Sequence, residues 1–135
     1  MLKLSKKCEY GLMAVRYLAF NSEGKNSTAR EISEYYQIPY ELVAKVLQKL
    51  TRKRVISSYQ GVGGGYFLTK PPEQISIGQV INAIEENYKI TDCIIENGLK
   101  SECNLVKNCR LRNPLIKLQK EIDKLFQNMK ITQIL

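Results

Sequence analysis

Three of the four cysteines in this 135-residue chain lie within one short polar segment, "TDCIIENGLKSECNLVKNCR", residues 91–110. Cys93, Cys103 and Cys109 follow the spacing C-x9-C-x5-C, and the chain contains no histidine. Thiolates are soft ligands that suit zinc, Cu(I) and iron–sulfur clusters. Clustered cysteines in a reducing compartment more often bind metal or react with oxidants than form structural disulfides, so this segment is the first candidate for chemistry.

The cysteine spacing leaves several interpretations open. It does not match the paired C-x2-C knuckles of structural zinc sites, and a cluster usually has a fourth protein ligand. Without histidine, the fourth ligand would have to be a small molecule or one of four side chains, Cys8, Glu9, Asp92 and Glu102. The same thiols could instead form a thiol–disulfide switch, or their clustering could be incidental.

The charge of the chain indicates a negatively charged partner. Lys and Arg total 21 against 13 Asp and Glu, and the net charge of +8 favours nucleic acid first and an anionic membrane surface second. No apolar run approaches the roughly 20 residues of a membrane helix. The basic and then apolar N-terminus lacks a small-residue cleavage site and is interrupted by Glu9 and Arg16. We therefore expect a helix there and not a signal peptide, and a cytoplasmic protein with no membrane partner.

Two short helices joined by a tight turn are predicted between residues 28 and 53. Thr28-x-x-Glu31 forms a capping box that begins the first helix, and Pro39 ends it. The second helix begins near Tyr40 and has one polar, mostly basic face. This pattern is typical of a helix-turn-helix, and a helical hairpin with a solvated lysine face is the alternative. The opposite, apolar face consists of Val43, Val46, Leu47 and Leu50.

The run "RVISSYQGVGGGYFLTK", residues 54–70, predicts a β-hairpin with glycines at its tip. A hairpin that directly follows a basic recognition helix is a wing, and its glycines let the backbone approach a phosphate or a groove closely. A nucleotide-binding loop is excluded, because no Gly-Lys-Ser/Thr follows and no helix opens there.

The C-terminal part predicts two more helices. Ser76-x-x-Gln79 caps the first, and Asn113 and Pro114 suit the N-cap and first turn of the second. The second helix has apolar residues at spacings of three and four, as in a coiled-coil seam, although a helix packed on its own domain is the alternative. We expect residues 113–130 to join two chains. The seam consists of Leu115, Leu118, Ile122, Leu125 and Met129.

These elements predict a mainly α fold with a small β-hairpin wing. Residues 1–72 would form a winged helix-turn-helix domain that binds DNA. Residues 73–135 would carry the cysteine segment and a long C-terminal dimerisation helix. An enzyme is not expected, since no nucleophile–base pair and no nucleotide loop is present.

Over nearly its whole length the chain resembles the Rrf-two family of bacterial winged-helix regulators. The likeness is carried by "EYGLMAVRYLA", "AREISEYYQIPYELVAKVLQKLTRKRVISS" and "GVGGGYFLTKPPEQISIGQVINAIE", followed by three cysteines and a long terminal helix. The resemblance implies a homodimer that binds a double-stranded DNA operator. It also implies an iron–sulfur cluster, 2Fe–2S or 4Fe–4S, on Cys93, Cys103 and Cys109.

The chain departs from the family at the fourth cluster ligand. Cluster-assembly regulators of this family have a histidine three residues after the last cysteine, where this chain has Arg112. Nitric-oxide sensors of the family use an acidic residue near the N-terminus of the partner chain, and the matching residue is Glu9, with Cys8 beside it. The resemblance thus implies Glu9 as fourth ligand and Cys8 as its substitute.

A second departure concerns the wing. Relatives that insert an arginine into the minor groove carry it where this chain has Gln60, so base reading would fall more on the recognition helix. We expect the DNA contacts to come from the helix-turn-helix and the wing tip. The candidates are Thr28, Tyr40, Glu41, Ala44, Lys45, Gln48, Lys49, Arg52, Lys53, Gln60, Gly61, Gly63 and Gly64.

The expected mechanism is control of operator affinity by the state of the cluster. One alternative is a thiol-redox or zinc-dependent regulator on the same scaffold. Another is a module whose winged-helix domain binds a protein.

Overall fold

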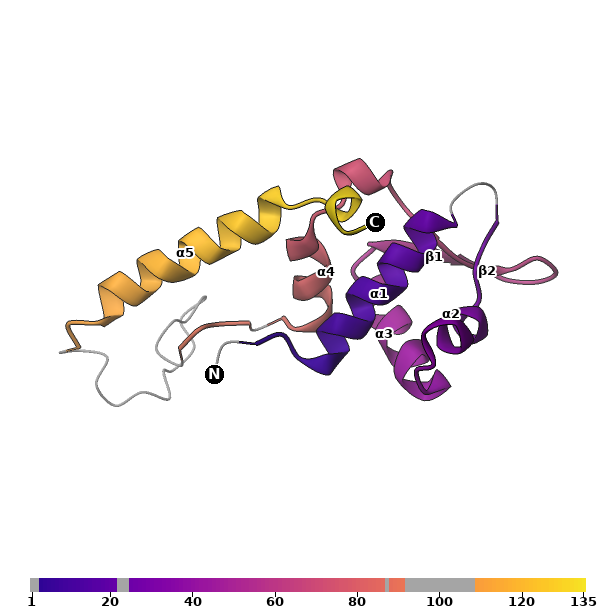
Figure 1. The fold of residues 1–135 in the computed structure, drawn as a ribbon, viewed down its shortest axis with the longest axis horizontal. Coiled ribbons are helices and arrows are strands. Elements are labelled where there is room, and N and C mark those ends of the chain that lie inside the picture. The colour runs from indigo at the N-terminus through magenta and orange to yellow at the C-terminus, as the bar shows by residue number, and fades with distance from the viewer. Residues whose placement is uncertain (1–2, 22–24, 87, 92–108) are drawn as a thin grey trace.

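A computed structural model of the chain describes residues 3–21, 25–86, 88–91 and 109–135 (Figure 1). Its elements confirm the predicted fold class of helices with one small hairpin. No helix in these ranges is both long enough and apolar enough to cross a membrane. In chain order the helices and strands are α1 (Lys6–Phe20), α2 (Ala29–Tyr36), α3 (Tyr40–Arg52), β1 (Ile56–Tyr59), β2 (Gly65–Leu68), α4 (Ile77–Ile84) and α5 (Arg112–Asn128), with short 3-10 helices at Pro72–Gln74 and Ile131–Ile134.

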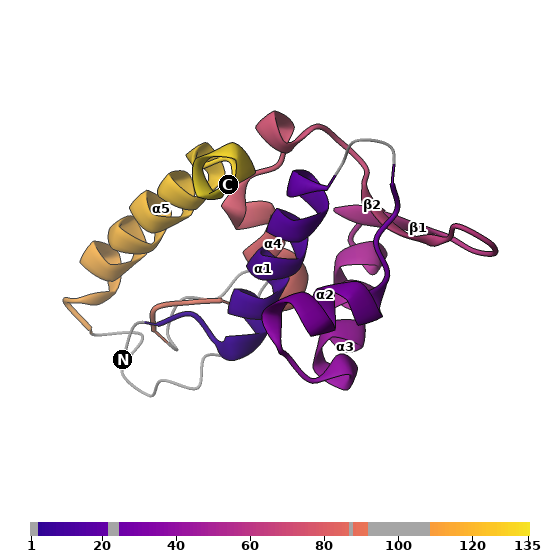
Figure 2. The same cartoon turned by 45° about the vertical axis from the view of Figure 1, so that its right-hand side comes forward.

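The hydrophobic core lies between α1, α3 and α4 (Figure 2). The predicted apolar stripe of α3 is confirmed, because none of its four residues is more than 3% exposed. Helices α1 and α4 approach closely at Gly11, where a Cβ atom would lie 2.9 Å from Ile84 Cγ1. Burial of these aliphatic side chains is the main source of stability for the domain that presents α3.

Both predicted capping boxes are present. The Thr28 hydroxyl accepts the Glu31 backbone N–H at 3.1 Å, and the Glu31 carboxylate accepts the Thr28 N–H at 3.4 Å. Ser76 and Gln79 make the same pair of bonds at 3.1 and 2.9 Å at the start of α4. Each cap satisfies backbone donors that the first helical turn leaves free, and such a cap typically contributes about 1 kcal/mol.

The predicted N-cap of α5 is wrong, since the helix begins before Asn113. Leu111 is the N-cap, its carbonyl accepts the Leu115 N–H at 3.0 Å, and the Cys109 carbonyl accepts the Arg112 N–H at 3.4 Å. Pro114 therefore lies inside the first turn. It is tolerated there, because the first four N–H groups of a helix have no partner within the helix.

The chain after α5 pairs with the segment that precedes α4. The Met129 carbonyl accepts the Ile77 N–H at 2.8 Å, and the Ile75 carbonyl accepts the Ile131 N–H at 2.9 Å. Ile131 is fully buried in the same core as α1, α3 and α4. We call this pairing of residues 75–77 with 129–131 the clasp. The domain boundary predicted after residue 72 stays a prediction. Both segments of the clasp follow that boundary in the chain, and both contribute residues to the core.

The hairpin is antiparallel, with Ile56 opposite Leu68 and Tyr59 opposite Gly65. Between α3 and the hairpin, Arg54 has φ 61°, a left-handed conformation that is unfavourable for a residue with a Cβ atom. The Arg54 and Val55 N–H groups bond the carbonyls of Thr51 and Leu50, both at 3.0 Å. This arrangement is the Schellman motif that ends many helices, and its left-handed position is usually glycine.

Replacement of Arg54 by glycine should therefore stabilise the fold. We expect Arg54→Gly to raise the free energy of unfolding by up to about 1 kcal/mol, because glycine adopts positive φ without strain. Urea denaturation measures the change. Arg52→Gly, the same substitution two residues earlier in helical backbone, should lower it by about 0.5–1 kcal/mol. Equal losses in the two variants would contradict the assignment of strain to Arg54.

Candidate nucleic-acid interface and cysteine segment

The face of α3 opposite the core is polar and open to solvent. Glu41, Lys45, Gln48 and Arg52 are exposed on it, and Tyr40 presents a ring that is 54% exposed at the start of the helix. Gln, Glu and Lys side chains can bond base edges in a major groove, and Arg also pairs with phosphates. The fold thus brings together the polar residues on which direct reading of DNA would depend.

Two other predicted contact residues lie at the edge of this face. Ala44 is half-buried, so only part of its methyl group is available to a base. Thr28 is also half-buried, and its hydroxyl oxygen is used in the cap of α2. A hydroxyl that accepts one bond can still donate its hydrogen, and a phosphate is a suitable acceptor.

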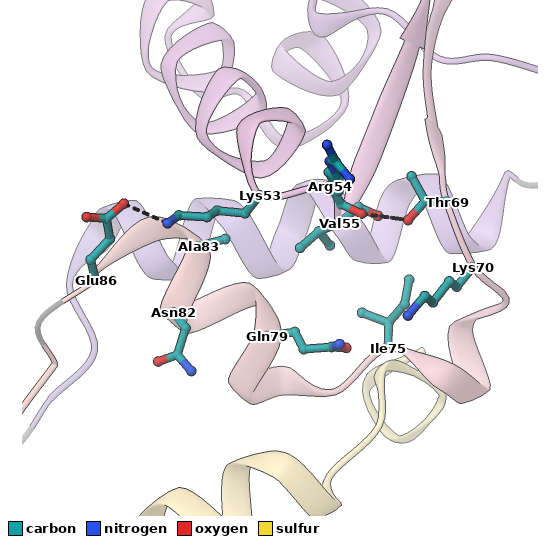
Figure 3. A pocket seen from close by; sticks show the side chains of 10 residues that line it. All are labelled: Lys53, Arg54, Val55, Thr69, Lys70, Ile75, Gln79, Asn82, Ala83 and Glu86. Atoms are coloured by element: carbon teal, nitrogen blue, oxygen red, sulfur yellow. Dashed lines mark hydrogen bonds and ion pairs between the residues drawn. The ribbon is translucent and has the colours of Figure 1, made fainter.

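Lys49 and Lys53 lie on the flank of α3 that faces α4. The Lys49 Nζ donates to the Ile84 carbonyl at the end of α4 at 3.2 Å. The Lys53 Nζ lies 3.0 Å from a carboxylate oxygen of Glu86 (Figure 3). The hydrogen bond from Lys53 lowers the pKa of Glu86. Both lysines stay predicted phosphate contacts, and here Lys49 bonds the end of α4 and Lys53 pairs with Glu86 just after it, which periodicity alone does not reveal.

A shallow groove of about 160 Å³ separates the start of α1 from the polar face of α3. Lys7 and Tyr10 of α1 line it together with Lys45, Gln48 and Arg52 of α3. Sequence reasoning missed Lys7 and Tyr10 as interface candidates. The basic residues near the N-terminus were a possible signal for a DNA contact. Only the packing of α1 on α3 places Lys7 beside the recognition residues.

The wing tip is a tight turn fixed at its base. Gly61 and Gly63 have φ values of 106° and 74°, and the Gly64 N–H bonds the Gly61 carbonyl at 3.0 Å. A Cβ atom on Gly64 would lie 2.4 Å from the Tyr59 carbonyl oxygen, so a side chain there would collide with the backbone. Val62 is fully exposed at the tip, and Gln60 is exposed beside it. A phosphate or groove could therefore approach the tip backbone closely.

The segment before α2 anchors the wing. Ser27 and Tyr66 exchange backbone hydrogen bonds of 3.0 and 2.7 Å, and the Asn26 side-chain amide donates to the Gly63 carbonyl at 3.2 Å. Gly65 passes so close to Ser27 that an added Cβ atom would lie 2.7 Å from the Ser27 carbonyl oxygen. The wing and the helix-turn-helix are thus held in one orientation.

Of the five predicted metal ligands, Cys93 and Cys103 lie outside the described residues. Cys109 is half-buried just before α5. Cys8 is completely buried on the core side of α1, and burial raises the pKa of its thiol. Glu9 lies at the surface, where Lys6 Nζ is 2.8 Å from its carboxylate. In the described part of the chain, no three metal-binding side chains come together.

The residues just before the cysteine segment are connected to α5, and Cys109 after it leads into that helix. The Ile90 N–H donates to the Gln119 side-chain oxygen at 2.8 Å, and the Gln119 amide donates to Asp123 at 2.8 Å. Tyr88 contacts Phe126, with ring centroids 6.0 Å apart. In both ribbon views residues 88–91 also run beside the chain that leads into α1, whereas the start of α5 projects away from α1 (Figures 1 and 2). Of the described residues that flank the segment, those before it thus lie closer to the first turn of α1 than those after it.

The predicted seam on α5 is largely uncovered. Leu118, Leu125 and Met129 are 45%, 63% and 38% exposed, while Leu115 and Ile122 are half-buried. The helix projects from the core beyond α4 (Figure 1). An apolar stripe of this kind on a projecting helix is a candidate surface for another helix.

Comparison with known proteins places this geometry in a family. The family model Rrf2, described as an iron-dependent transcriptional regulator, matches residues 4–135. The HTH-type transcriptional regulator NsrR of Shouchella clausii is 32% identical over 114 residues, which cover 84% of this chain and 75% of that protein. NsrR of Bacillus subtilis is 31% identical and covers 84% of this chain and 77% of its own length.

Solved structures share the fold at lower identity. CymR, the global cysteine regulator of B. subtilis, has a TM-score of 0.75 at 20% identity and covers 99% of this chain and 96% of its own. IscR of T. potens has a TM-score of 0.71 at 22% identity, with 98% and 85% covered. An oxidised form of Staphylococcus aureus CymR has a TM-score of 0.70 at 22% identity, with 96% and 93% covered.

The contrast between Cys8 and Cys109 can be tested by alkylation. In reduced, iron-free protein at pH 8, we expect iodoacetamide to modify Cys109 at least roughly tenfold faster than Cys8, because the thiolate reacts and Cys8 is both enclosed and shifted toward its neutral form. Peptide mass analysis at timed intervals measures the two rates. In denaturant the rates should converge, and equal rates in the native protein would contradict the burial of Cys8.

Proposed function

The chain belongs to the Rrf2 family of transcriptional regulators, and we propose that it is a homodimeric, cytoplasmic, DNA-binding member whose operator affinity depends on an iron–sulfur cluster. As a member of a family of regulators, it is not an enzyme. The observation that carries the proposal is the polar outward face of α3 beside a wing that is fixed to the same domain.

DNA binding would use two kinds of contact. Tyr40, Glu41 and Gln48, which are exposed, would read base edges, and Lys45 and Arg52 beside them would bond base or phosphate oxygens. The glycine tip of the wing would approach the neighbouring backbone or minor groove. Lys7 extends this surface across the groove between α1 and α3, and the net charge of +8 supports a strong phosphate contribution.

A two-fold dimer is proposed through α5, in the region of residues 113–130. The exposed side chains of Leu118, Leu125 and Met129 would be removed from water by the same helix of a second chain. A two-fold axis would present two recognition helices to a palindromic operator. The seventeen-residue α5 is about 25 Å long, which is sufficient for two heptads of contact.

The proposed cluster ligands are Cys93, Cys103 and Cys109, with Glu9 of the other subunit as the fourth. Thiolates are soft ligands that fit an iron–sulfur cluster, and the family is described as iron-dependent. When bound, the cluster would supply a group sensitive to oxidation or to loss of iron. Glu9 suits the fourth position better than Cys8, because its carboxylate is at the surface and Cys8 is enclosed in the core.

The position of Glu9 also suggests how ligation would reach the DNA face. Glu9 lies between Cys8, which is fixed in the core, and Tyr10, which lines the groove against α3. Holding or releasing Glu9 would shift the first turn of α1, and Lys7 and Tyr10 would move relative to the recognition residues. Coupling requires that the two cluster states bind DNA with different affinity.

Thiol oxidation is the second candidate function. It is favoured by the likeness to CymR, which has been crystallised in an oxidised form, and by the partial exposure of Cys109. In that case the cysteines would act as thiols and α3 and the wing would keep their role.

Spectroscopy separates the two candidates. Protein purified without oxygen should absorb between about 320 and 460 nm and contain iron and sulfide. Serine at any of the three segment cysteines should abolish the bands, Glu9→Ala should speed cluster loss, and Cys8→Ala should change neither. If Glu9→Ala and Cys8→Ala both leave spectrum and stability unchanged, the fourth ligand is misassigned. Protein that stays colourless after reconstitution would support the thiol alternative.

The coupling itself is tested by DNA affinity with and without the cluster. We expect the two forms to differ by about 1–3 kcal/mol in binding free energy for a DNA site selected with the cluster-loaded protein, which is the usual size of a coupling energy between two sites. Fluorescence anisotropy at one fixed salt concentration measures both. Equal affinities would rule out cluster control.

Base reading and phosphate contact should respond differently to mutation. Gln48→Ala should weaken binding to the selected site by about 1–3 kcal/mol and leave binding to a random duplex nearly unchanged. Arg52→Gln should weaken both and reduce the slope of log affinity against log salt by about 0.9. Lys120→Gln, on α5, is the charge-matched control. Equal effects of Gln48→Ala on both duplexes would contradict base reading by α3.

A further inference from the structure

A cavity of about 580 Å³ lies between the base of the wing and α4, on the flank of α3 away from its outward face (Figure 3). Lys53 and Arg54 approach from the end of α3, Lys70 from the end of the hairpin, and Gln79 and Asn82 from α4. None of the outward-facing residues of α3 lines it. The cavity is therefore separate from the proposed base-reading surface.

The lining carries an excess of positive charge. Three cations face one acid, Glu86, which is paired with Lys53 at 3.0 Å. Arg54 and Lys70 remain as the cations to which a ligand would bind. Lys70 and Gln79 extend toward each other across the cavity (Figure 3). The Gln79 oxygen accepts the Ser76 N–H, so the Gln79 amide NH2 is the group that can donate to a ligand.

The backbone at Arg54 fixes where one of these cations leaves the chain. Arg54 keeps a left-handed conformation where glycine would be less strained, and Thr69 donates to its carbonyl at 2.8 Å. Strained residues are common at ligand sites, where the side chain has a use that outweighs its cost. Here the strained residue supplies one of the two cations that have no ion-pair partner among the described lining residues.

The remaining wall is apolar and formed by Val55, Ile75 and Ala83. The volume lies within the range of small-molecule sites, which combine apolar walls with a few converging polar groups. We propose that this cavity binds a small organic anion with at least two negative charges, either a polycarboxylate or a phosphate ester. The carbon skeleton would lie on the apolar wall, and the charged oxygens would bond Arg54, Lys70 and the Gln79 amide.

Such a ligand would connect the wing to α4. Lys70 follows β2, and α4 is held to α5 by the clasp, so the ligand would fix the wing relative to the proposed dimerisation helix. This second input would be independent of the cysteines. It goes beyond the proposed function, and its binding test needs neither the cluster nor an operator sequence.

The test is titration of the full-length protein with probe anions at constant ionic strength. Citrate and glycerol 2-phosphate distinguish the two sources of charge, and acetate and glycerol are the singly charged and neutral controls. Amide NMR spectra and isothermal titration calorimetry report binding. We expect one of the two polyanions to saturate and to shift the Lys70 backbone and Gln79 side-chain amide signals, whereas acetate and glycerol do not.

Three variants locate the site. Arg54→Gly, which keeps the turn, and Lys70→Gln should each weaken binding by about tenfold, the usual effect of losing a charge-assisted hydrogen bond. Glu86→Gln frees Lys53 and should strengthen binding by about threefold. Lys120→Gln, which removes a charge outside the cavity, should change nothing.

Three results would overturn the proposal. One is that neither polyanion binds more tightly than acetate. Another is that Lys120→Gln weakens binding as much as Lys70→Gln, which would indicate general screening. The third is that a random DNA duplex displaces the bound anion and shifts the same amides, which would assign the cavity to the DNA backbone.

Discussion

The clasp between residues 75–77 and 129–131 is the interaction on which the arrangement of the two functional regions depends. Its two backbone hydrogen bonds, of 2.8 and 2.9 Å, join α5 to the segment before α4, and Ile131 fills a position in the core between α1, α3 and α4. The Ser76 hydroxyl caps α4 and also bonds the Gln127 side chain at 3.2 Å. A hydrogen bond of this kind contributes only about 1 kcal/mol, so buried Ile131 supplies most of the stabilisation. Apart from the clasp, the described residues that tie α5 to the rest of the chain include Gln119, Phe126 and Gln127.

A second connection runs from the end of the chain to the helix-turn-helix. Arg16 of α1 donates to the Ile134 carbonyl at 2.9 Å and to the Tyr36 hydroxyl at 3.5 Å. Tyr36 belongs to a group of three edge-to-face rings with Tyr17 and Tyr35. Such ring pairs prefer defined geometries, so the C-terminal residues, α1 and α2 are held in register. Helix α3 is thus supported through α2 on one flank and through Lys49 and Lys53 on the other.

Local signals made much of this fold predictable. The failures come from local turns that the residue types do not indicate and from contacts between distant residues. The capping boxes at Thr28 and Ser76, the stripe of α3 and the hairpin are short-range patterns, and each is confirmed. The N-cap of α5 was misplaced because a turn beginning at Cys109 extends the helix backwards, although Asn113 has the better capping side chain. The left-handed conformation of Arg54 occurs at a residue type that gives no signal for it. The clasp joins two segments that are far apart in the sequence, and no local pattern encodes their pairing. The same limit applies to the site: periodicity identified the polar face of α3, but only the packed structure assigns Lys49 and Lys53 to α4 and adds Lys7.

The clasp also has a consequence for the order of events during synthesis. A domain normally folds once its own residues have left the ribosome, N-terminal part first. Here the core around α1 and α3 lacks Ile131 until residues 129–131 emerge, long after the wing is complete. The nascent chain would carry an unfilled apolar core while α5 is still being made, which favours transient protection by a chaperone. The final packing of the part that presents α3 would then coincide with the appearance of the helix proposed to join two chains.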